Sequence, residues 1–301
     1  EEARIVEFVI SSTVAEDPPQ PQPLGPPRLN FRGRLMLMRQ IASDTEVDAV
    51  ALVMKGAPDF ARALDLLDEI ERLKQSGKTV VCYAESLSDT ELMLASAADL
   101  LVMPPSGTLF LDGLVVESMY FKDMLAKVDV HVEQLSIGEY KTAYEEFAHS
   151  EMSAGQRQTL EDLLDEFYGQ MITTTARNRG VGTEVVEGLY AQLMVPADRA
   201  TEAGVLDAAE FHDQYEARVA TMLGVESTEW VDDYGQDSDE LEALLNNPFA
   251  MMSALPALLN PPPREPPTEP YVAIVYATGE IVSGSSQADF YGNVASMGSD
   301  T

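Results

Sequence analysis

Short apolar runs alternate with amphipathic stretches in the first third of the chain, and this alternation limits the possible folds more than any other feature. Runs with the composition of buried strands lie at Val47–Met54, Thr79–Tyr83 and Leu100–Met103. The intervening stretches, Ala61–Gln75 and Thr90–Ala98, have the apolar spacing of helices. Strands joined through helices form right-handed crossovers and pair in parallel. The pattern therefore predicts an α/β fold, with a mostly parallel sheet and peripheral helices.

Elements outside this region are predicted on the same grounds. Gly204 is expected to end a helix, because glycine readily adopts the left-handed conformation that follows a last helical turn. The remaining predictions are strands at Ala3–Ile10 and Val130–Leu135, and helices at Leu114–Val128, Gln156–Asn178, Ala197–Ala203 and Glu210–Leu223.

The chain is strongly acidic, with 19 Lys and Arg residues against 51 Asp and Glu residues and a formal net charge of -32. Such a charge repels phosphate backbones and anionic membrane surfaces, which argues against nucleic-acid binding. The densest acidic run, residues 226–242, is predicted to be a solvated loop followed by the start of a helix. A calcium site is the weaker interpretation of this run, because the EF-hand spacing is absent.

Two proline-rich stretches divide the chain. We interpret Pro261–Pro270 as an extended linker between a first domain, residues 1–260, and the start of a second domain, residues 271–301. The earlier stretch, Pro18–Pro27, is also expected to be extended and exposed. The apolar run after the linker has the character of the opening strand near Ala3, which suggests that a second copy of the domain begins there.

Most of the familiar cofactor and catalytic motifs are missing from the sequence. The three histidines, His131, His149 and His212, have no metal-ligand spacing, and no HExxH motif occurs. There is also no GxGxxG, no GxxxxGK[ST] and no GxSxG motif. Cys82 lies in an apolar run and is interpreted as a buried, inert thiol. We therefore expect no metal, no nucleotide and no other cofactor.

The segment around Lys141 is the best candidate for chemistry. Lys141 lies between Tyr140 and Tyr144, with Phe147 nearby. Aromatic cover removes a lysine from water, and burial lowers the pKa of an ammonium group. A neutral lysine can accept a proton from a hydroxyl group, as the base of a Ser-Lys pair does. The alternative is a solvated loop lysine, paired with a neighbouring acid such as Glu139 or Glu145.

Several stretches of the chain resemble the long form of the signal peptide peptidase A family, membrane-associated Ser-Lys peptidases with a ClpP/crotonase-type fold. The most specific is Gly138–Ala143, which continues to Phe147 and is followed by Glu151–Ser153. Weaker similarities lie at Val81–Glu85, Leu94–Asp99, Leu111–Leu114, Ala200–Asp207, Tyr271–Val282 and Gly298–Thr301.

The resemblance implies two tandem half-domains that share one active site. The first half would donate the general-base lysine, Lys141, and the second would donate the serine nucleophile beyond Thr301. Asp89 stands roughly where a serine would stand in the first half. Ser86 and Ser88 lie close to it, but Ser88 or Asp89 is better interpreted as the N-cap of the following helix. Gly56–Pro58 stands where a glycine-rich oxyanion loop would lie and is poor in glycine.

The resemblance further implies partners and a location. The substrates would be hydrophobic signal-peptide remnants, and the complete protein would self-associate. It would lie in the bacterial cell envelope, bound to the inner membrane by an anchor that precedes Glu1 and facing the periplasm. One alternative is a catalytically silent scaffold or peptide-binding module of the same fold. A second is a crotonase-type acyl-CoA enzyme, which would need oxyanion donors that Gly56–Pro58 does not promise.

Overall fold

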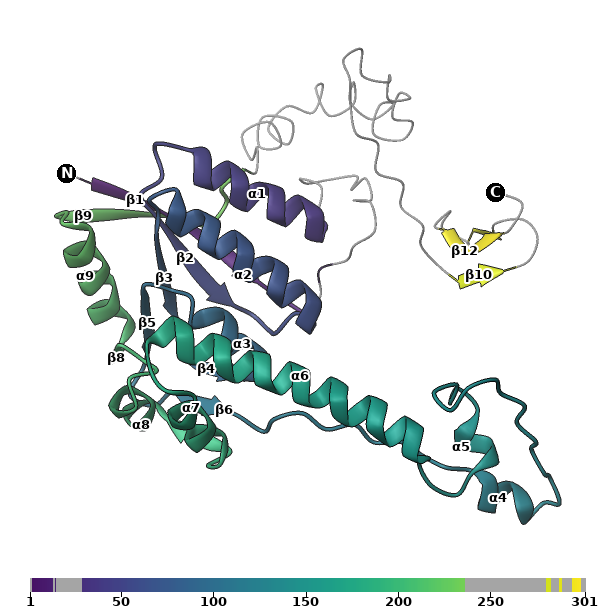
Figure 1. The fold of residues 1–301 in the computed structure, drawn as a ribbon. Helices are drawn as coiled ribbons and strands as arrows, with labels where there is room; N and C mark the ends of the chain where they lie inside the picture. The colour runs from purple at the N-terminus through teal and green to yellow at the C-terminus, as the bar shows by residue number, and fades with distance from the viewer. Residues whose placement is uncertain are drawn as a thin grey trace. The chain divides into compact units, whose positions relative to one another are not determined.

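The computed structural model describes residues 2–12, 14, 29–235, 280–282, 287–288 and 294–298 (Figure 1). These residues fall into two compact units, which we describe separately. The first unit comprises residues 1–12 and 41–232, and the second comprises residues 13–40 and 233–301. All the residues singled out above for chemistry lie in the first unit. The linker at Pro261–Pro270 and most of residues 271–301 lie outside the described residues, so the division into half-domains stays a prediction.

A six-stranded parallel sheet forms the centre of the first unit, in the order β8-β5-β3-β2-β1-β9. All five neighbouring pairs run parallel. The prediction of a mostly parallel α/β sheet is therefore confirmed. The strands are β1 (Glu2–Ile10), β2 (Ala49–Met54), β3 (Thr79–Tyr83), β5 (Leu100–Met103), β8 (Ala208–Ala209) and β9 (Ser227–Val231).

The described residues also form a smaller sheet and several helices. The small sheet pairs β4 (Ser86–Ser88), β6 (Thr108–Phe110) and β7 (Met194–Pro196) in the order β4-β6-β7. The helices with the most turns are α1 (Phe31–Ser43), α2 (Phe60–Gln75), α6 (Ala154–Arg179) and α9 (His212–Leu223). The shorter helices are α3 (Asp89–Ala95), α4 (Lys122–Ala126), α5 (Glu145–Ala148), α7 (Thr183–Tyr190) and α8 (Ala197–Glu202). In the second unit, β10 (Glu280–Val282), β12 (Val294–Gly298) and β11 (Gln287–Ala288) form a separate sheet.

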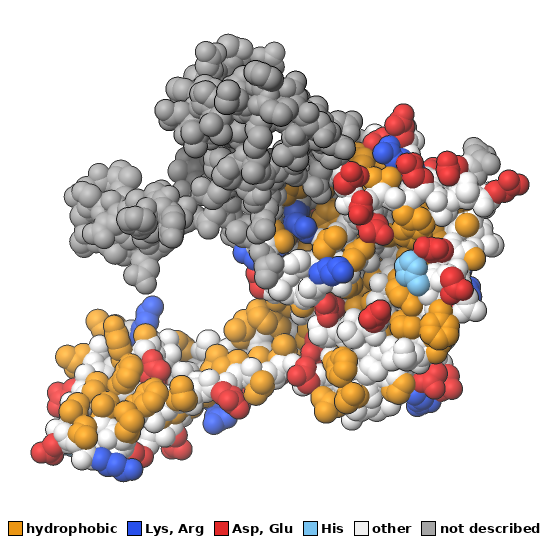
Figure 2. All heavy atoms as spheres, turned by 180° about the vertical axis from the view of Figure 1, so that it is seen from behind, with side chains coloured by type: hydrophobic (Ala, Val, Ile, Leu, Met, Phe, Trp, Pro, Cys, Tyr) orange, Lys and Arg blue, Asp and Glu red, His pale blue; other side chains and the backbone are white. Residues whose placement is uncertain are grey.

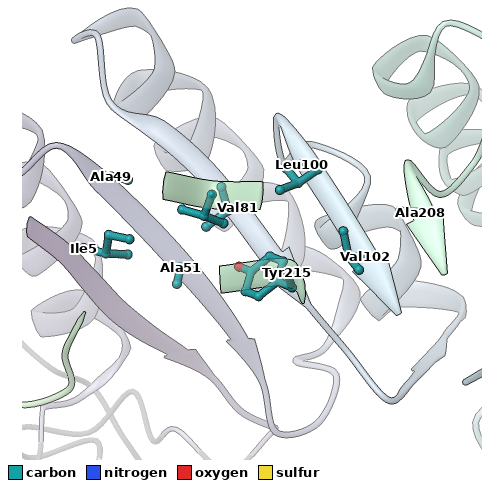
Figure 3. Close-up of a cluster of buried hydrophobic side chains, with 9 residues drawn as sticks. Ile5, Ala49, Ala51, Val81, Leu100, Val102, Ala208 and Tyr215 are labelled. Carbon is teal, nitrogen blue, oxygen red and sulfur yellow. The ribbon is translucent and has the colours of Figure 1, made fainter. Parts of the chain in front are cut away.

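One face of the large sheet packs against α9. Side chains alternate between the two faces of a strand, so every second residue of β2, β3 and β5 points to the same side. Tyr215 of α9 lies over the middle of this face (Figure 3), and Val219 packs beside it. The sheet contributes the small and branched side chains around them: Ile5, Ala49, Ala51, Val81, Leu100, Val102 and Ala208.

Local signals explain where α2 begins and ends. Asp59 is the N-cap, and its Oδ1 accepts a hydrogen bond from the backbone N–H of Arg62 at 3.0 Å. Leu66, Ile70 and Leu73 lie on one side of the helix and are buried. Gly77 follows the last turn with φ +90°, a conformation that glycine adopts without strain. The chain then continues directly into β3.

Three sequence predictions in the described residues are wrong. Residues 114–128 do not form one helix, since only Lys122–Ala126 is helical, and Val130–Leu135 is not a strand. Most of the apolar side chains of both stretches are exposed. The acidic run begins with a strand, because β9 pairs with the edge of the sheet at β1 and Trp230 packs against the core around Tyr215.

No helix among the described residues is both long and apolar enough to cross a membrane.

Candidate functional site

Lys141 lies on a segment of the first unit that extends away from the sheets after β6 and returns to them through α6. We call residues 114–153 the arm. Its two short helices, α4 and α5, are held together by stacking of Phe121 on Phe147, whose ring centroids are 5.8 Å apart. The N–H of Phe121 donates to the carbonyl of Glu146 at 2.6 Å. Figure 1 shows these helices at the far end of α6 from the large sheet.

The backbone at Lys141 is fixed by two hydrogen bonds. The N–H of Lys141 donates to the carbonyl of Gly138 at 3.3 Å, and Gly138 has φ +101°. The side-chain amide of Gln134 donates to the carbonyl of Lys141 at 2.9 Å. The side chain of Lys141 itself is exposed. The main chain is thus held in a turn while the amino group projects into solvent.

The expected aromatic cover over Lys141 does not form within the described chain. Tyr140 and Tyr144 are 61% and 66% exposed, so neither ring shields the amine from water. The three neighbouring acids, Glu139, Glu145 and Glu146, differ in exposure. Glu139 and Glu146 are exposed, but Glu145 is 5% exposed and its Oε2 has no hydrogen-bond partner among the described residues. The buried side chain of this segment is therefore the carboxylate and not the lysine.

The arm carries most of the large exposed apolar side chains of the first unit. Leu135 and Ile137 are almost fully exposed, and they lie just before the lysine motif. Figure 2 shows hydrophobic side chains gathered over the arm. The other exposed aliphatic and methionine side chains of the arm are Leu114, Val115, Val116, Met119, Met124, Val128, Val130 and Val132. Exposed apolar surface of this kind marks places where proteins or membranes bind.

The start of α6 closes the base of the lysine turn. Ser153 caps this helix, and its Oγ accepts from the N–H of Gln156 at 3.2 Å. The hydroxyl of Tyr120 donates to the side chain of Gln156 at 2.7 Å. A Cβ on Gly155 would lie 2.5 Å from the carbonyl oxygen of Glu139, so only glycine permits this approach.

The turn from β4 into α3 contains the other residues that the sequence singles out, Ser86, Ser88 and Asp89. Ser86 is exposed on β4. Ser88 is engaged, because its N–H and its hydroxyl both donate to Oε2 of Glu91, at 2.9 and 2.7 Å. This arrangement confirms Ser88 as the N-cap. Gly56 has φ +134° and packs against Ser12.

Asp89 lies beside Ser88 and is only 8% exposed. Its Oδ1 accepts from the N–H of Gly113 at 3.3 Å, and the carboxyl group of Asp112 and the hydroxyl of Tyr190 lie near enough to affect its pKa. Burial, followed by the hydrogen bond with Asp112, raises the pKa of Asp89 to about 6. Burial also raises the pKa of Tyr190, with the charge of Asp89 adding to the effect.

Cys82 and the histidines are the remaining candidates. Burial raises the pKa of Cys82 to about 12, which confirms it as an inert thiol. No group of three or more His, Cys, Asp and Glu side chains in the described part of the chain could hold a metal ion.

Comparison with known proteins places this arrangement in a family. The model described as peptidase family S49 matches residues 72–226, just over half of the chain. The chain belongs to peptidase family S49. The match covers the lysine turn, the Asp89 turn and α6 together. The resemblance inferred from Gly138–Ala143 is therefore confirmed for the family.

Two curated relatives are longer than this chain. Protease 4 of Haemophilus influenzae is 33% identical over 120 residues, which are 40% of this chain and 20% of that protein. The chloroplastic serine protease SPPA of Arabidopsis thaliana is 29% identical over 164 residues, which cover 53% of this chain and 24% of that protein. The matches thus span a quarter or less of these two proteins. A solved mutant of the 1510-N membrane-bound stomatin-specific protease is similar at a TM-score of 0.43 and 10% identity, over 76% of this chain and 97% of that one.

Sequence reasoning found Lys141 and Asp89 but missed the groups that hold them. Asp112 and Tyr190 come from distant segments, and no local spacing connects them with Asp89. Gln134 precedes Lys141 by seven residues in a stretch that was assigned to a strand. A polar side chain facing the lysine turn was therefore interpreted as one face of a β-strand.

Proposed function

We propose that this chain supplies the general base of a Ser-Lys peptidase, with Lys141 as the base. The observation that carries the proposal is an exposed lysine in a fixed turn, surrounded by apolar side chains without cover. A lysine acts as a base only when it is neutral, and removal from water favours the neutral form. The cover has to come from outside the first unit, either from a further part of the protein or from a second copy.

The serine in this proposal comes from a second half-domain that continues beyond Thr301. Within the described residues Ser88 is engaged with Glu91. By the resemblance, Asp89 stands roughly where a serine would stand in the first half. The serine oxygen would attack the peptide carbonyl while Lys141 accepts the hydroxyl proton. The same lysine would then return the proton to the leaving amine. Backbone N–H groups of the second half would bind the oxyanion.

The substrates in this proposal are hydrophobic signal-peptide remnants, and the complete protein associates with a membrane in the bacterial cell envelope, facing the periplasm. The names of the two curated relatives describe proteases, one of them bacterial. The exposed apolar side chains of the arm support an extended apolar substrate. They also support self-association of the complete protein, in which arms of neighbouring copies would cover one another.

The test compares Lys141→Ala with Lys127→Ala in the full-length protein. Both lysines are exposed on the arm, so both changes remove one positive charge from the same surface. Hydrolysis of an extended hydrophobic peptide should fall roughly a hundredfold to ten-thousandfold in Lys141→Ala. The Lys127→Ala variant should stay within about twofold of the wild type. Equal activity in Lys141→Ala and wild type would leave a silent scaffold or peptide-binding module as the function.

A second measurement tests the division of the active site. The 301-residue chain alone should hydrolyse no peptide, because the proposal assigns the partner serine to the second half-domain. Turnover by this chain that survives Lys141→Ala and requires Ser86 would show that the active site is complete in another form.

A further inference from the structure

The small sheet has one buried side and one exposed side. Strand residues in register project to the same side, and successive residues of a strand alternate between the two sides. The buried side consists of Leu87, Leu109 and Val195, which are aligned across β4, β6 and β7 and are each 0% exposed. The residues that project to the other side are Ser86, Ser88, Thr108, Phe110, Met194 and Pro196. We call these six residues the outer face.

Two large apolar side chains lie next to each other on the outer face. Phe110 of β6 is paired directly with Met194 of β7, and the two residues are 45% and 54% exposed. Side chains that are directly opposite in an antiparallel pair are close enough to touch. Phe110 and Met194 therefore present one continuous apolar surface to solvent.

Leu193 extends this surface and has an unusual backbone conformation. Its φ is +63°, in the left-handed region that side chains of this size rarely adopt. The turn is held by two hydrogen bonds, since the N–H of Leu193 donates to the carbonyl of Tyr190 at 3.2 Å and its carbonyl accepts from Leu111 at 2.8 Å. Glycine would adopt this turn without strain, yet a leucine stands here and is 54% exposed. Backbone strain that packing within the chain does not offset points to a role in binding.

The open edge of β7 is poorly suited to accept a further strand. The N–H of Met194 is already engaged, because it donates to the carbonyl of Gln192 at 2.7 Å. Pro196 has no N–H to donate. A ligand of this region would therefore be held by side-chain contacts on the outer face and not by a ladder of backbone hydrogen bonds.

The charge around the outer face limits the kind of ligand that fits it. The chain has 51 Asp and Glu residues against 19 Lys and Arg residues, but none of the six residues of the outer face is charged. Exposed acids lie just beyond it in the sequence, at Glu85, Asp112 and Asp198. An apolar segment with basic flanks suits such a surface, because the acids at its margin attract positive charge and repel negative charge.

A peptide fits the outer face better than a second copy of this chain does. Stable interfaces between folded proteins bury about 800 Å² on each partner and use roughly 20–30 residues a side, which is far more than the outer face provides. Two copies that each carry a net charge of -32 also repel each other. The chain belongs to a family of peptidases, and peptides are the ligands of such proteins.

We propose that the outer face, together with Leu193, is a peptide-binding site separate from the lysine turn. It holds an extended apolar segment with basic flanks. The apolar side chains of this segment pack on Phe110, Met194 and Leu193, and its flanks lie toward the acids at the margin. The site goes beyond the proposed function, because it requires neither Lys141 as a base nor a serine.

Fluorescence anisotropy of a labelled peptide, titrated with the 301-residue chain, tests this proposal. The peptide has about ten residues, in which Ala and Leu alternate between a lysine at each end, so that its leucines point to one side when it is extended. Leu193→Gly and Phe110→Ser each remove one apolar side chain from the site. Leu193→Gly keeps the fold, because glycine adopts the left-handed conformation without strain. Phe211→Ser is the matched control, since Phe211 is an exposed phenylalanine outside the site, next to the start of α9.

Leu193→Gly and Phe110→Ser should each bind the peptide roughly tenfold or more weakly than the wild type, because each loses a large apolar contact. Phe211→Ser should bind it as the wild type does. Replacing the two terminal lysines of the peptide by glutamates should also weaken binding. The difference between the two peptides should shrink at high salt concentration, which screens the acids at the margin.

Absence of binding by the wild type, or equal binding by wild type and Leu193→Gly, would overturn the proposal. An equal loss in Phe211→Ser would overturn it as well, since binding would then not depend on the outer face. Sedimentation velocity without peptide identifies the other occupant. A wild-type dimer that becomes a monomer in Leu193→Gly would make this surface an interface between copies and would exclude the peptide site. Because binding is measured without turnover, failure here is separate from failure of Lys141 as the base.

Discussion

The large sheet and the arm are built from similar amino acids, but the same apolarity has different outcomes in the two regions. Leu100–Met103 is an apolar run of four residues, and every one of its side chains is buried in β5. Val130–Leu135 has alternating apolar residues, yet it forms no strand and Leu135 is 101% exposed. An apolar pattern predicts an element only where a second surface is available to receive it.

Neighbouring backbone makes the difference between the two regions. β5 lies between β3 and β8, so its N–H and carbonyl groups have partners on both sides. The arm has only its own turns, a pair of stacked rings and the start of α6 to hold it. The arm is therefore expected to be the less stable part of the first unit, while its fixed turn at Lys141 remains locally ordered.

The largest contrast should come from truncating one leucine in each region. Leu52→Ala removes a fully buried side chain from β2, in the middle of the sheet, and should lower the free energy of unfolding by about 2–5 kcal/mol. Leu135→Ala removes an exposed side chain and should change the free energy of unfolding by less than about 0.5 kcal/mol. Urea denaturation measures both. A loss of 2 kcal/mol in Leu135→Ala would show that the arm is packed in solution.

A smaller loss of stability is expected when the ion pair that connects α6 to the sheet is broken. Nη2 of Arg179 lies 2.7 Å from Oδ1 of Asp207, and Oδ2 of Asp207 accepts from the N–H of Leu101 at 2.7 Å. Asp207→Asn should destabilise by about 1–3 kcal/mol, because it leaves the buried guanidinium of Arg179 without a counter-charge. Asp198→Asn, at an exposed acid in α8, is the control. Equal midpoints of thermal denaturation in the two variants would contradict this account.

The sheet was predictable from the sequence because its signals are local. Thr79–Tyr83 and Leu100–Met103 were predicted to the residue, since each is a continuous apolar run bounded by a glycine, an acid or a proline. The predicted helix at Gln156–Asn178 differs from α6 by two residues at its start and one at its end. In each case composition, period and boundary signals agree.

The parts that were not predictable depend on contacts between distant segments. β9 lies in an acidic run and was not predicted. As an edge strand it keeps charged side chains in solvent, while Trp230 packs against the core. Glu145 carries a charge that should favour solvent, but it is buried between the turns of the arm. Asp89 and Gly113 are brought together only in the folded chain. Lys141 was singled out because its motif is contiguous in the sequence.

A pH effect on stability should follow from Asp89. The pKa of this carboxyl is raised in the folded state, so its contribution to stability is complete below the unfolded value near 4 and is lost as the pH rises through about 6. Between pH 4.5 and pH 7.5, wild type should lose roughly 1 kcal/mol relative to Asp89→Asn, because partial solvation weakens the full effect. Urea denaturation of both proteins at each pH gives the difference. A constant difference between them would show that Asp89 does not titrate in this range.

The smallest effect on overall stability, and the sharpest separation of the two regions, is expected from two alanine substitutions in α6. Gly155 and Gly169 both lie inside this helix, so Ala should favour the helix by roughly 0.5–1 kcal/mol at either position. At Gly169 a Cβ meets nothing within 4 Å, whereas at Gly155 it would lie 2.5 Å from the carbonyl oxygen of Glu139.

Gly169→Ala should therefore raise the midpoint of thermal denaturation by a few degrees at most. In Gly155→Ala the gain is offset by displacement of the lysine turn, so the midpoint should stay close to that of wild type. Hydrogen exchange should then separate the variants, with faster exchange of residues 134–145 in Gly155→Ala alone and no change in β2 or β3. If both variants leave that segment protected, the turn does not depend on its contact with α6. If β2 also exchanges faster in Gly155→Ala, the arm and the sheet unfold as one cooperative unit.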